Sequence, residues 1–219
     1  MRKRFENQLN DLNRMMAKMG ELLEKSLSMT HNAMTGRDAE LAEKVILHDI
    51  SIDEMEKEIE ALCMRLLMQQ QPVARDLRVI SAALKIITDM ERIGDHAADI
   101  AENIGYMAKD DYTPNIEDTL KMIDITTQMV KDSVRAFVQN DLELAQMVFA
   151  KDDEVDALFL KIKMKVSEKL RTDASFGEQA IDLMMNAKHY ERIGDHAENI
   201  AEWVEFSITG THRKSTNGR

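Results

Sequence analysis

The sequence predicts an all-α protein, and three observations point to that class. Its 219 residues include only two prolines and eight glycines, so few positions interrupt regular structure. Alanine, leucine, methionine, glutamate and lysine are abundant while aromatic residues make up 5%, a balance that favours helices. No segment shows the two-residue alternation of polar and apolar side chains that is typical of a strand. We therefore expect long helices and no sheet.

The few breaks in the sequence divide it into long segments. A helix of about 30 residues is about 45 Å long, so the expected elements are rods rather than the short helices of a globin. Six such helices are expected, at residues 3–35, 38–69, 75–109, 115–139, 141–171 and 176–208.

Local signals mark where these helices begin and end. Gly36 closes the first helix and Asp38 can cap the second. Pro72 ends the second helix, because proline disfavours helix in the residue before it. Three later starts combine a capping residue with one that favours the first turn. These pairs are Thr113 with Pro114, Asn140 with Glu143, and Ser175 with Glu178.

Apolar residues in the third helix recur at spacings of three and four, which predicts one buried stripe. The stripe consists of Ile80, Ala83, Ile87, Met90, Gly94, Ala97, Ala101 and Ile104. Methionines along the first helix are most simply core residues, with an exposed methionine surface for a partner as the alternative. They are Met15, Met16, Met19, Met29 and Met34.

The heptapeptide ERIGDHA occurs twice, at residues 91–97 and 191–197, with an offset of 100. GRDAELAEKV at 36–45 similarly resembles QNDLELAQMV at 139–148, with an offset of 103. The duplication predicts two pseudo-symmetric three-helix bundles, and a pair of repeats is too few for a solenoid. The expected units are residues 1–112 and 113–209, followed by a polar, basic tail at 210–219.

Each unit contains two pairs of carboxylates four residues apart, where helical geometry places side chains one above the other. Two carboxylates ~6 Å apart at an effective dielectric constant of ~20 repel by about 3 kcal/mol, so four that converge require a counter-charge. A multivalent cation with oxygen ligands provides one, and an all-carboxylate set suits Mg, Mn, Fe or Zn. The predicted metal ligands are Asp49, Asp53, Glu91, Asp95, Asp152, Asp156, Glu191 and Asp195.

A solvated acidic face is the alternative for any single pair, but four pairs at matching places favour a site. Gly94 and Gly194 interrupt helices at a cost of about 1 kcal/mol each, which indicates close helix packing or room for a ligand. His96 and His196 are expected to support the site or to be exposed rather than to bind metal. Further candidates for metal or supporting contacts are Asp99, Glu102, Asn199, Glu202 and His48.

Composition and motifs exclude several classes. The net charge of −11 argues against nucleic-acid binding. A single cysteine, Cys63, excludes an internal disulfide and fits a reducing compartment. No signal peptide or membrane-spanning segment is expected. We therefore expect a cytoplasmic protein. The sequence contains no Ser–His–Asp set, glycine-rich phosphate loop or CxxC motif, so we do not expect an enzyme. His48 and Asp49 form an HD pair without the further ligands that a phosphohydrolase requires.

Several motifs resemble the PhoU family of phosphate-uptake regulators over essentially the whole chain. The motifs are the duplicated ERIGDHA with the adjoining IAE, QQPVARDLR at 70–78 and ITGTH at 208–212. The resemblance implies a non-enzymatic, homodimeric adaptor that couples the ATPase of a phosphate ABC transporter to a phosphate-sensing histidine kinase. Such proteins restrain both uptake and the phosphate-starvation response, and they reach the membrane only through these partners.

The resemblance also implies multinuclear metal clusters, of iron or zinc in some members, at the eight carboxylates named above. The two sites are expected to differ, with the second weaker or holding fewer ions. Asp99 corresponds to Asn199 in the second repeat, and Glu56 corresponds to Phe159. A metal-storage protein or metal-dependent enzyme on a helical bundle is the alternative function. The absence of the ferritin-type Glu-x-x-His motif favours the adaptor.

Overall fold

The computed structural model describes residues 2–69, 73–108 and 117–212. Within these ranges all the regular structure is helical, which confirms the predicted all-α class. The α-helices are α1 (Arg2–Gly36), α2 (Ala39–Gln69), α3 (Ala74–Met107), α4 (Glu117–Gln139), α5 (Leu142–Thr172) and α6 (Gly177–Thr209), and a 3₁₀ turn, η1 (Ala174–Phe176), precedes α6.

The boundary between α1 and α2 follows the sequence signals. Arg37 adopts a left-handed conformation, with φ of 52°, and the backbone N–H of Leu41 donates to Asp38 Oδ1 at 2.9 Å. Asp38 therefore caps α2 as predicted. The predicted start at Thr113 and Pro114 lies outside the described residues, as does the tail from residue 213 onward.

Two predicted caps are wrong. At the start of α5, Asp141 accepts from the N–H of Leu144 at 3.0 Å, while Asn140 has a φ of 52°. Asparagine tolerates that left-handed conformation better than most residues, so it closes α4 and leaves the cap to its neighbour. Before α6, both the N–H and the hydroxyl of Ser175 donate to Asp173 Oδ1, because an aspartate readily binds the backbone two residues on.

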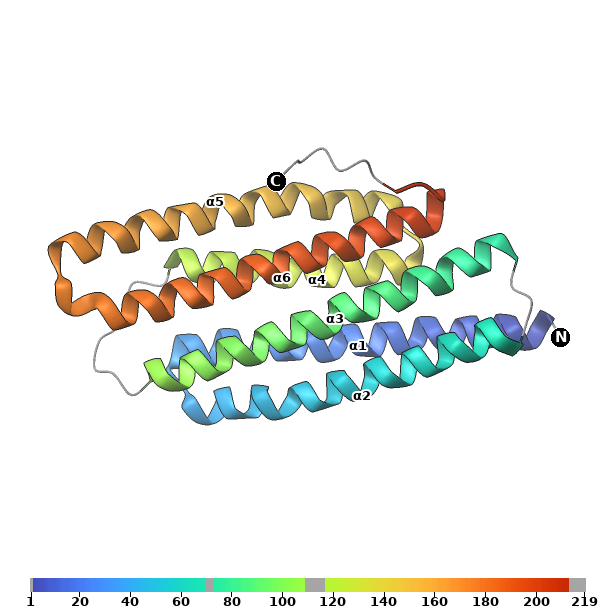
Figure 1. Cartoon of the computed structure of the whole chain (residues 1–219), viewed down its shortest axis with the longest axis horizontal. Coiled ribbons are helices and arrows are strands. Elements are labelled where there is room, and N and C mark those ends of the chain that lie inside the picture. The colour runs from blue at the N-terminus through green and yellow to red at the C-terminus, as the bar shows by residue number, and fades with distance from the viewer. Residues whose placement is uncertain (1, 70–72, 109–116, 213–219) are drawn as a thin grey trace.

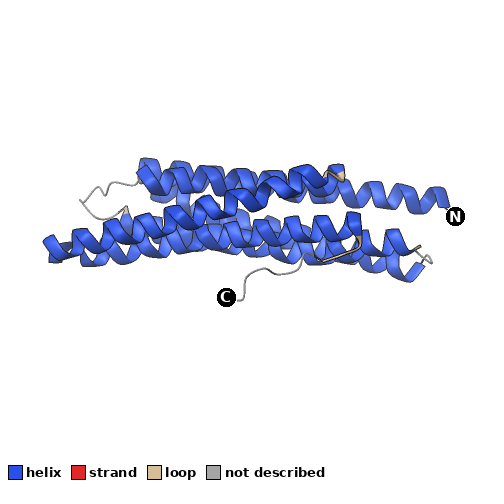
Figure 2. Cartoon of the chain, turned by 90° about the horizontal axis from the view of Figure 1, so that it is seen from above, coloured by secondary structure: helices blue, strands red, loops and turns tan. Residues whose placement is uncertain are grey.

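The helices form two bundles, α1–α3 and α4–α6, which run along the same long axis (Figures 1 and 2). Every helix of a bundle contacts the other two of that bundle. The bundles meet through α3 with α6 and α1 with α4, and the α3–α6 contact is the most extensive between any two helices. The two ERIGDHA helices therefore lie side by side at the centre of the molecule (Figure 1).

One continuous hydrophobic core extends through both bundles. The predicted stripe of α3 is buried along its whole length. Met16, Met19 and Met34 are buried, and Met15 and Met29 pack against the core, so the core interpretation of the α1 methionines is confirmed. A buried hydrogen bond of 3.2 Å from the Tyr190 hydroxyl to Thr30 Oγ1 further connects α6 to α1.

Candidate functional site

Three carboxylates of the first repeat converge between α2 and α3. Asp49 and Asp53 lie one turn apart on α2, and Asp95 faces them from α3. One oxygen of each lies within 4.8 Å of the others, and all three side chains are partly buried. These three residues are the first acidic cluster. Three of the four carboxylates expected to share one surface therefore lie together in this repeat, and the fourth, Glu91, is near enough to interact electrostatically with Asp95 and Asp53.

Gly94 makes room for this cluster. A Cβ atom at position 94 would lie 2.6 Å from Asp49 Oδ1 and 3.1 Å from the nearest atom of Ile52. Any other residue would therefore displace the carboxylate. Asp49 Oδ1 is itself buried and has no hydrogen-bond partner in the part of the chain that the structure describes. A buried oxygen that lacks a donor, packed against a glycine and beside two further carboxylates, is a ligand arrangement that fits a cation.

The electrostatics of the cluster reflect its crowding. Burial, followed by repulsion from Asp53 and Asp95, raises the pKa of Asp49 to about 6. The pKa of Glu91 is also raised, chiefly by burial and then by Asp95. Arg92, with 56% of its side chain exposed, approaches Glu91 at 3.5 Å and donates to Asp95 Oδ2 at 3.0 Å. Among the described residues, no cation is paired with the inner carboxylate, Asp49.

The second repeat reproduces the inner part of this arrangement. A Cβ atom at Gly194 would lie 3.2 Å from Asp152 Oδ1, so the glycine again faces the first aspartate of the preceding helix. Burial, followed by repulsion from Glu198, Asp195 and Asp156, raises the pKa of Asp152 to about 7. Asp152, Asp156, Asp195 and Glu198 are the second acidic cluster. The comparison of repeats gave no signal for Glu198, because the first repeat has alanine at that position.

The second acidic cluster differs in its outer contacts. Lys188, in the place of Thr88, forms a short ion pair with Glu191. Its ammonium also lies 5.5 Å from the ring centroid of Phe159, which occupies the place of Glu56. Among the described residues, no three carboxylates of this repeat approach one another as closely as those of the first cluster. One of the predicted metal ligands, Glu191, is thus already paired with the ammonium group of Lys188.

The further candidates are dispersed. Nε2 of His48 donates to the backbone oxygen of Leu22 at 3.2 Å, so the ring faces α1 and not the acidic cluster. Glu102 is exposed and accepts a hydrogen bond from Tyr106, and Glu202 is partly buried on α6. Asn199 donates to Asp89 at 3.2 Å.

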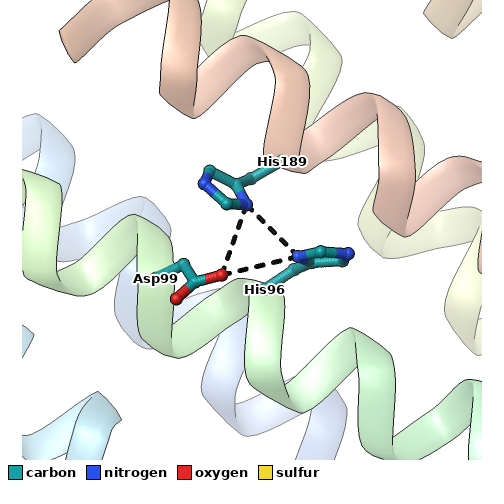
Figure 3. A group of neighbouring side chains, drawn as sticks. All are labelled: His96, Asp99 and His189. Atoms are coloured by element: carbon teal, nitrogen blue, oxygen red, sulfur yellow. Dashed lines mark hydrogen bonds and ion pairs between the residues drawn. The ribbon is translucent and has the colours of Figure 1, made fainter.

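Asp99 belongs to a second group that sequence analysis did not anticipate. Its carboxylate lies close to the rings of His96 and His189 where α3 meets α6 (Figure 3). We expected His96 to support the acidic site or to be exposed, and the structure shows it buried in this contact. The signal available in the sequence was His189 in the place of Asp89, but its meaning depends on knowing that α3 packs against α6.

Within the described part of the chain, no helix has an apolar segment long enough to cross a lipid bilayer.

Known proteins resemble this chain along almost its whole length. A family model described as the PhoU domain matches it twice, at residues 16–104 and 119–204. A "phosphate-specific transport system accessory protein PhoU homolog" from Clostridium acetobutylicum is 37% identical over 95% of this chain and 96% of its own. The "PhoU homolog 1" of Thermotoga maritima is 33% identical over 96% of this chain and 91% of its own.

Solved structures agree with this match. The crystal structure of PhoU from Pseudomonas aeruginosa superposes with a TM-score of 0.90 at 31% identity, covering 94% of this chain and all of the other. The phosphate transport system regulatory protein PhoU from Streptococcus pneumoniae gives 0.89 at 26% identity, over 96% and 99% of the two chains. The two family matches, one in each bundle, also agree with an internal duplication. The chain belongs to the PhoU family.

Proposed function

We propose that this protein is a regulatory accessory protein of phosphate uptake that restrains the transporter and the phosphate-starvation response. The observation that supports this most directly is the match to PhoU proteins along the whole chain. The Clostridium relative is named as an accessory protein of a phosphate-specific transport system, and the match covers 96% of it.

In this proposal the protein acts in the cytoplasm as a homodimeric adaptor. Its partners are the ATPase subunit of the phosphate ABC transporter and a phosphate-sensing histidine kinase. Exposed apolar side chains on the outer helices offer surface for protein partners. They include Leu47, Ile50 and Met68 on α2, and Leu160 and Met164 on α5.

We further propose that the acidic clusters bind metal. In the first repeat the ligands are Asp49, Asp53, Asp95 and the adjoining Glu91. In the second they are Asp152, Asp156 and Asp195 of the cluster, together with Glu191 of the motif, which lies outside it. The unpartnered Asp49 Oδ1, which packs against Gly94, and the convergence of three carboxylates support this assignment in the first repeat. Carboxylate oxygens suit Mg, Mn, Fe or Zn, and several such ligands in one place suit more than one ion.

A phosphate-regulated reporter in cells tests the regulatory role. Deletion of the gene should switch on phosphate-starvation promoters in phosphate-rich medium, and the wild-type chain should restore repression. A variant lacking four motif carboxylates should fail to restore it at normal protein level. That variant is Glu91→Ala/Asp95→Ala/Glu191→Ala/Asp195→Ala.

The matched control removes four carboxylates from exposed positions of α2 and α5 outside the clusters. It is Glu43→Ala/Glu58→Ala/Glu154→Ala/Glu168→Ala, and it should repress normally. Full repression by the motif variant would mean that the acidic clusters have no regulatory role. Repression that is unaffected by deleting the gene would contradict the adaptor function itself. Sustained turnover by metal-loaded protein would instead support the alternative, a metal-dependent enzyme.

A further inference from the structure

Two histidines and one aspartate face one another across the contact between the two repeats. Nδ1 of His96, on α3, lies 3.2 Å from Nδ1 of His189, on α6. Oδ2 of Asp99, one turn beyond His96, lies 3.7 Å from the first ring nitrogen and 3.6 Å from the second. Figure 3 shows the three side chains pointing toward a common centre. We call this group the inter-repeat triad.

These separations match those between ligands of one metal ion. Zinc binds imidazole nitrogen and carboxylate oxygen at about 2.0–2.2 Å in tetrahedral geometry, which places neighbouring ligand atoms about 3.3 Å apart. The three separations in the inter-repeat triad range from 3.2 to 3.7 Å. We propose that His96, His189 and Asp99 form a binding site for one divalent transition-metal ion, distinct from the carboxylate clusters.

The ligand set selects a different class of ion from the acidic clusters. Two imidazoles and one carboxylate suit borderline metals such as zinc, cobalt, nickel or ferrous iron, whereas the carboxylate clusters also suit magnesium and manganese. The site is also accessible, because 52% of the Asp99 side chain is exposed while the two rings are 11% and 14% exposed. An ion can therefore reach the site from the exposed side of Asp99, and the imidazole nitrogens can replace part of its hydration shell.

The symmetry-related position shows what this contact looks like without a metal site. The residues that correspond to His189, His96 and Asp99 are Asp89, His196 and Asn199. There, His196 Nδ1 lies 2.8 Å from Asp89 Oδ1, and Asn199 donates to the same oxygen at 3.2 Å. An imidazole, a carboxylate and an amide thus satisfy one another.

The triad has a different balance of donors and acceptors. An imidazole replaces the carboxylate and a carboxylate replaces the amide, so two ring nitrogens face each other across 3.2 Å beside an acceptor. A single shared proton can satisfy the two rings but leaves the Asp99 carboxylate beside them at more than 3.5 Å. One cation can bind all three groups.

Because α3 and α6 belong to different repeats, the ion would connect the two bundles at their most extensive contact. Binding of metal at this site should therefore resist their separation, since an ion that binds only the folded contact stabilises it by mass action.

Cobalt titration of the full-length protein, with imidazole ring signals followed by NMR, tests the proposal. Visible d–d absorption reports cobalt in a low-coordinate site, and the ring signals identify which histidines bind. The wild type is expected to bind one equivalent with the His96 and His189 rings as ligands, and zinc should displace it. His189→Gln and Asp99→Asn should each weaken this binding by more than about 100-fold, beyond the loss that outer-shell changes cause.

Matched variants separate the triad from its surroundings. His196→Gln removes the symmetry-related histidine and should still bind one equivalent of cobalt at the inter-repeat triad. Asp53→Asn/Asp95→Asn disrupts the first acidic cluster and should also keep this cobalt site. Asp99→Asn introduces the residue that the second repeat already has, at a half-exposed position, so a folded variant is expected and circular dichroism checks it. Unchanged cobalt affinity in both His189→Gln and Asp99→Asn would overturn the proposal. So would ring signals of His96 and His189 that do not respond to cobalt or zinc, because the two rings would then share only a hydrogen bond.

Discussion

The two acidic clusters derive from the same motif yet differ in the residues around it. In the first, Asp49 is surrounded by Asp53, Asp95 and Glu91, with a partly exposed arginine on the outer side. In the second, Asp152 has Glu198 as its strongest charged neighbour, and Lys188 binds the motif glutamate. The differences lie at positions outside the identical heptapeptide. The repeated motif thus supplies the glycine that faces the inner aspartate of the preceding helix, while the residues around the motif set the charge of each site.

Metal binding should show the largest difference between the clusters. At a free metal concentration of about 100 times Kd, an ion that binds only the folded protein raises the free energy of unfolding by about 2.7 kcal/mol. We expect Asp53→Asn/Asp95→Asn to remove more of the stabilisation by manganese than Asp156→Asn/Asp195→Asn does. Manganese suits the carboxylate ligands more than the histidine pair, so thermal unfolding with and without it measures this.

Lys188→Thr sharpens this comparison, because threonine is the residue of the first repeat. Removing the ammonium should increase the stabilisation of the second cluster by manganese. Equal loss of stabilisation in the two double variants, together with no effect of Lys188→Thr, would show that the outer contacts do not distinguish the sites.

Substitution of the two motif glycines should differ in stability. A Cβ atom at position 94 would lie 2.6 Å from Asp49 Oδ1, whereas at position 194 the closest atom, Asp152 Oδ1, is 3.2 Å away. We expect Gly94→Ala to lower the free energy of unfolding by about 1–2 kcal/mol, as overpacking does. Gly194→Ala should be close to neutral, because the gain of about 1 kcal/mol in helix propensity offsets the tighter contact. Urea unfolding measures both, and equal effects would mean that the two glycines face equivalent space.

The smallest expected difference between the two clusters is in how the inner aspartates, Asp49 and Asp152, make stability depend on pH. Each has a folded-state pKa above its ordinary value of 3.8, about 6 for Asp49 and about 7 for Asp152. For each aspartate, at pH values between its ordinary pKa and its folded-state pKa, the folded protein binds more protons than the unfolded chain. The stability of the protein therefore falls as pH rises through that window. The window therefore extends to about pH 6 for Asp49 and about pH 7 for Asp152.

Replacing either aspartate by asparagine should remove this loss. With metal chelated at pH 8, Asp49→Asn and Asp152→Asn should each stabilise the protein by on the order of 1 kcal/mol, a value reduced for partial exposure. Chemical unfolding between pH 4 and 8 would show it. Wild-type stability that rises with pH through this range, with no gain from either variant, would contradict the assigned causes of the pKa shifts.

Local features of the sequence determined the helices, their approximate ends and the pairing of carboxylates along each helix. These features could be predicted because helical periodicity and capping depend on residues within a few positions of one another. The duplication was visible for the same reason, as a direct match between segments. The two wrong caps, at Asn140 and Ser175, lie beside aspartates that the sequence pattern did not single out. Asp141 caps α5, whereas Asp173 caps the 3₁₀ turn and α6 begins without a side-chain cap.

Only the tertiary structure decided which helices meet and which side chains come together between them. That α3 packs against α6 follows from how apolar faces far apart in the chain fit in a common core, and no short window of sequence contains that information. The contact brings His96 to His189, two residues that local pattern gave no reason to combine. Packing across helices likewise placed Gly94 against Asp49 and Glu198 near Asp152. The sequence thus determined the carboxylates on each helix, and the packing of the helices decided which groups share a site.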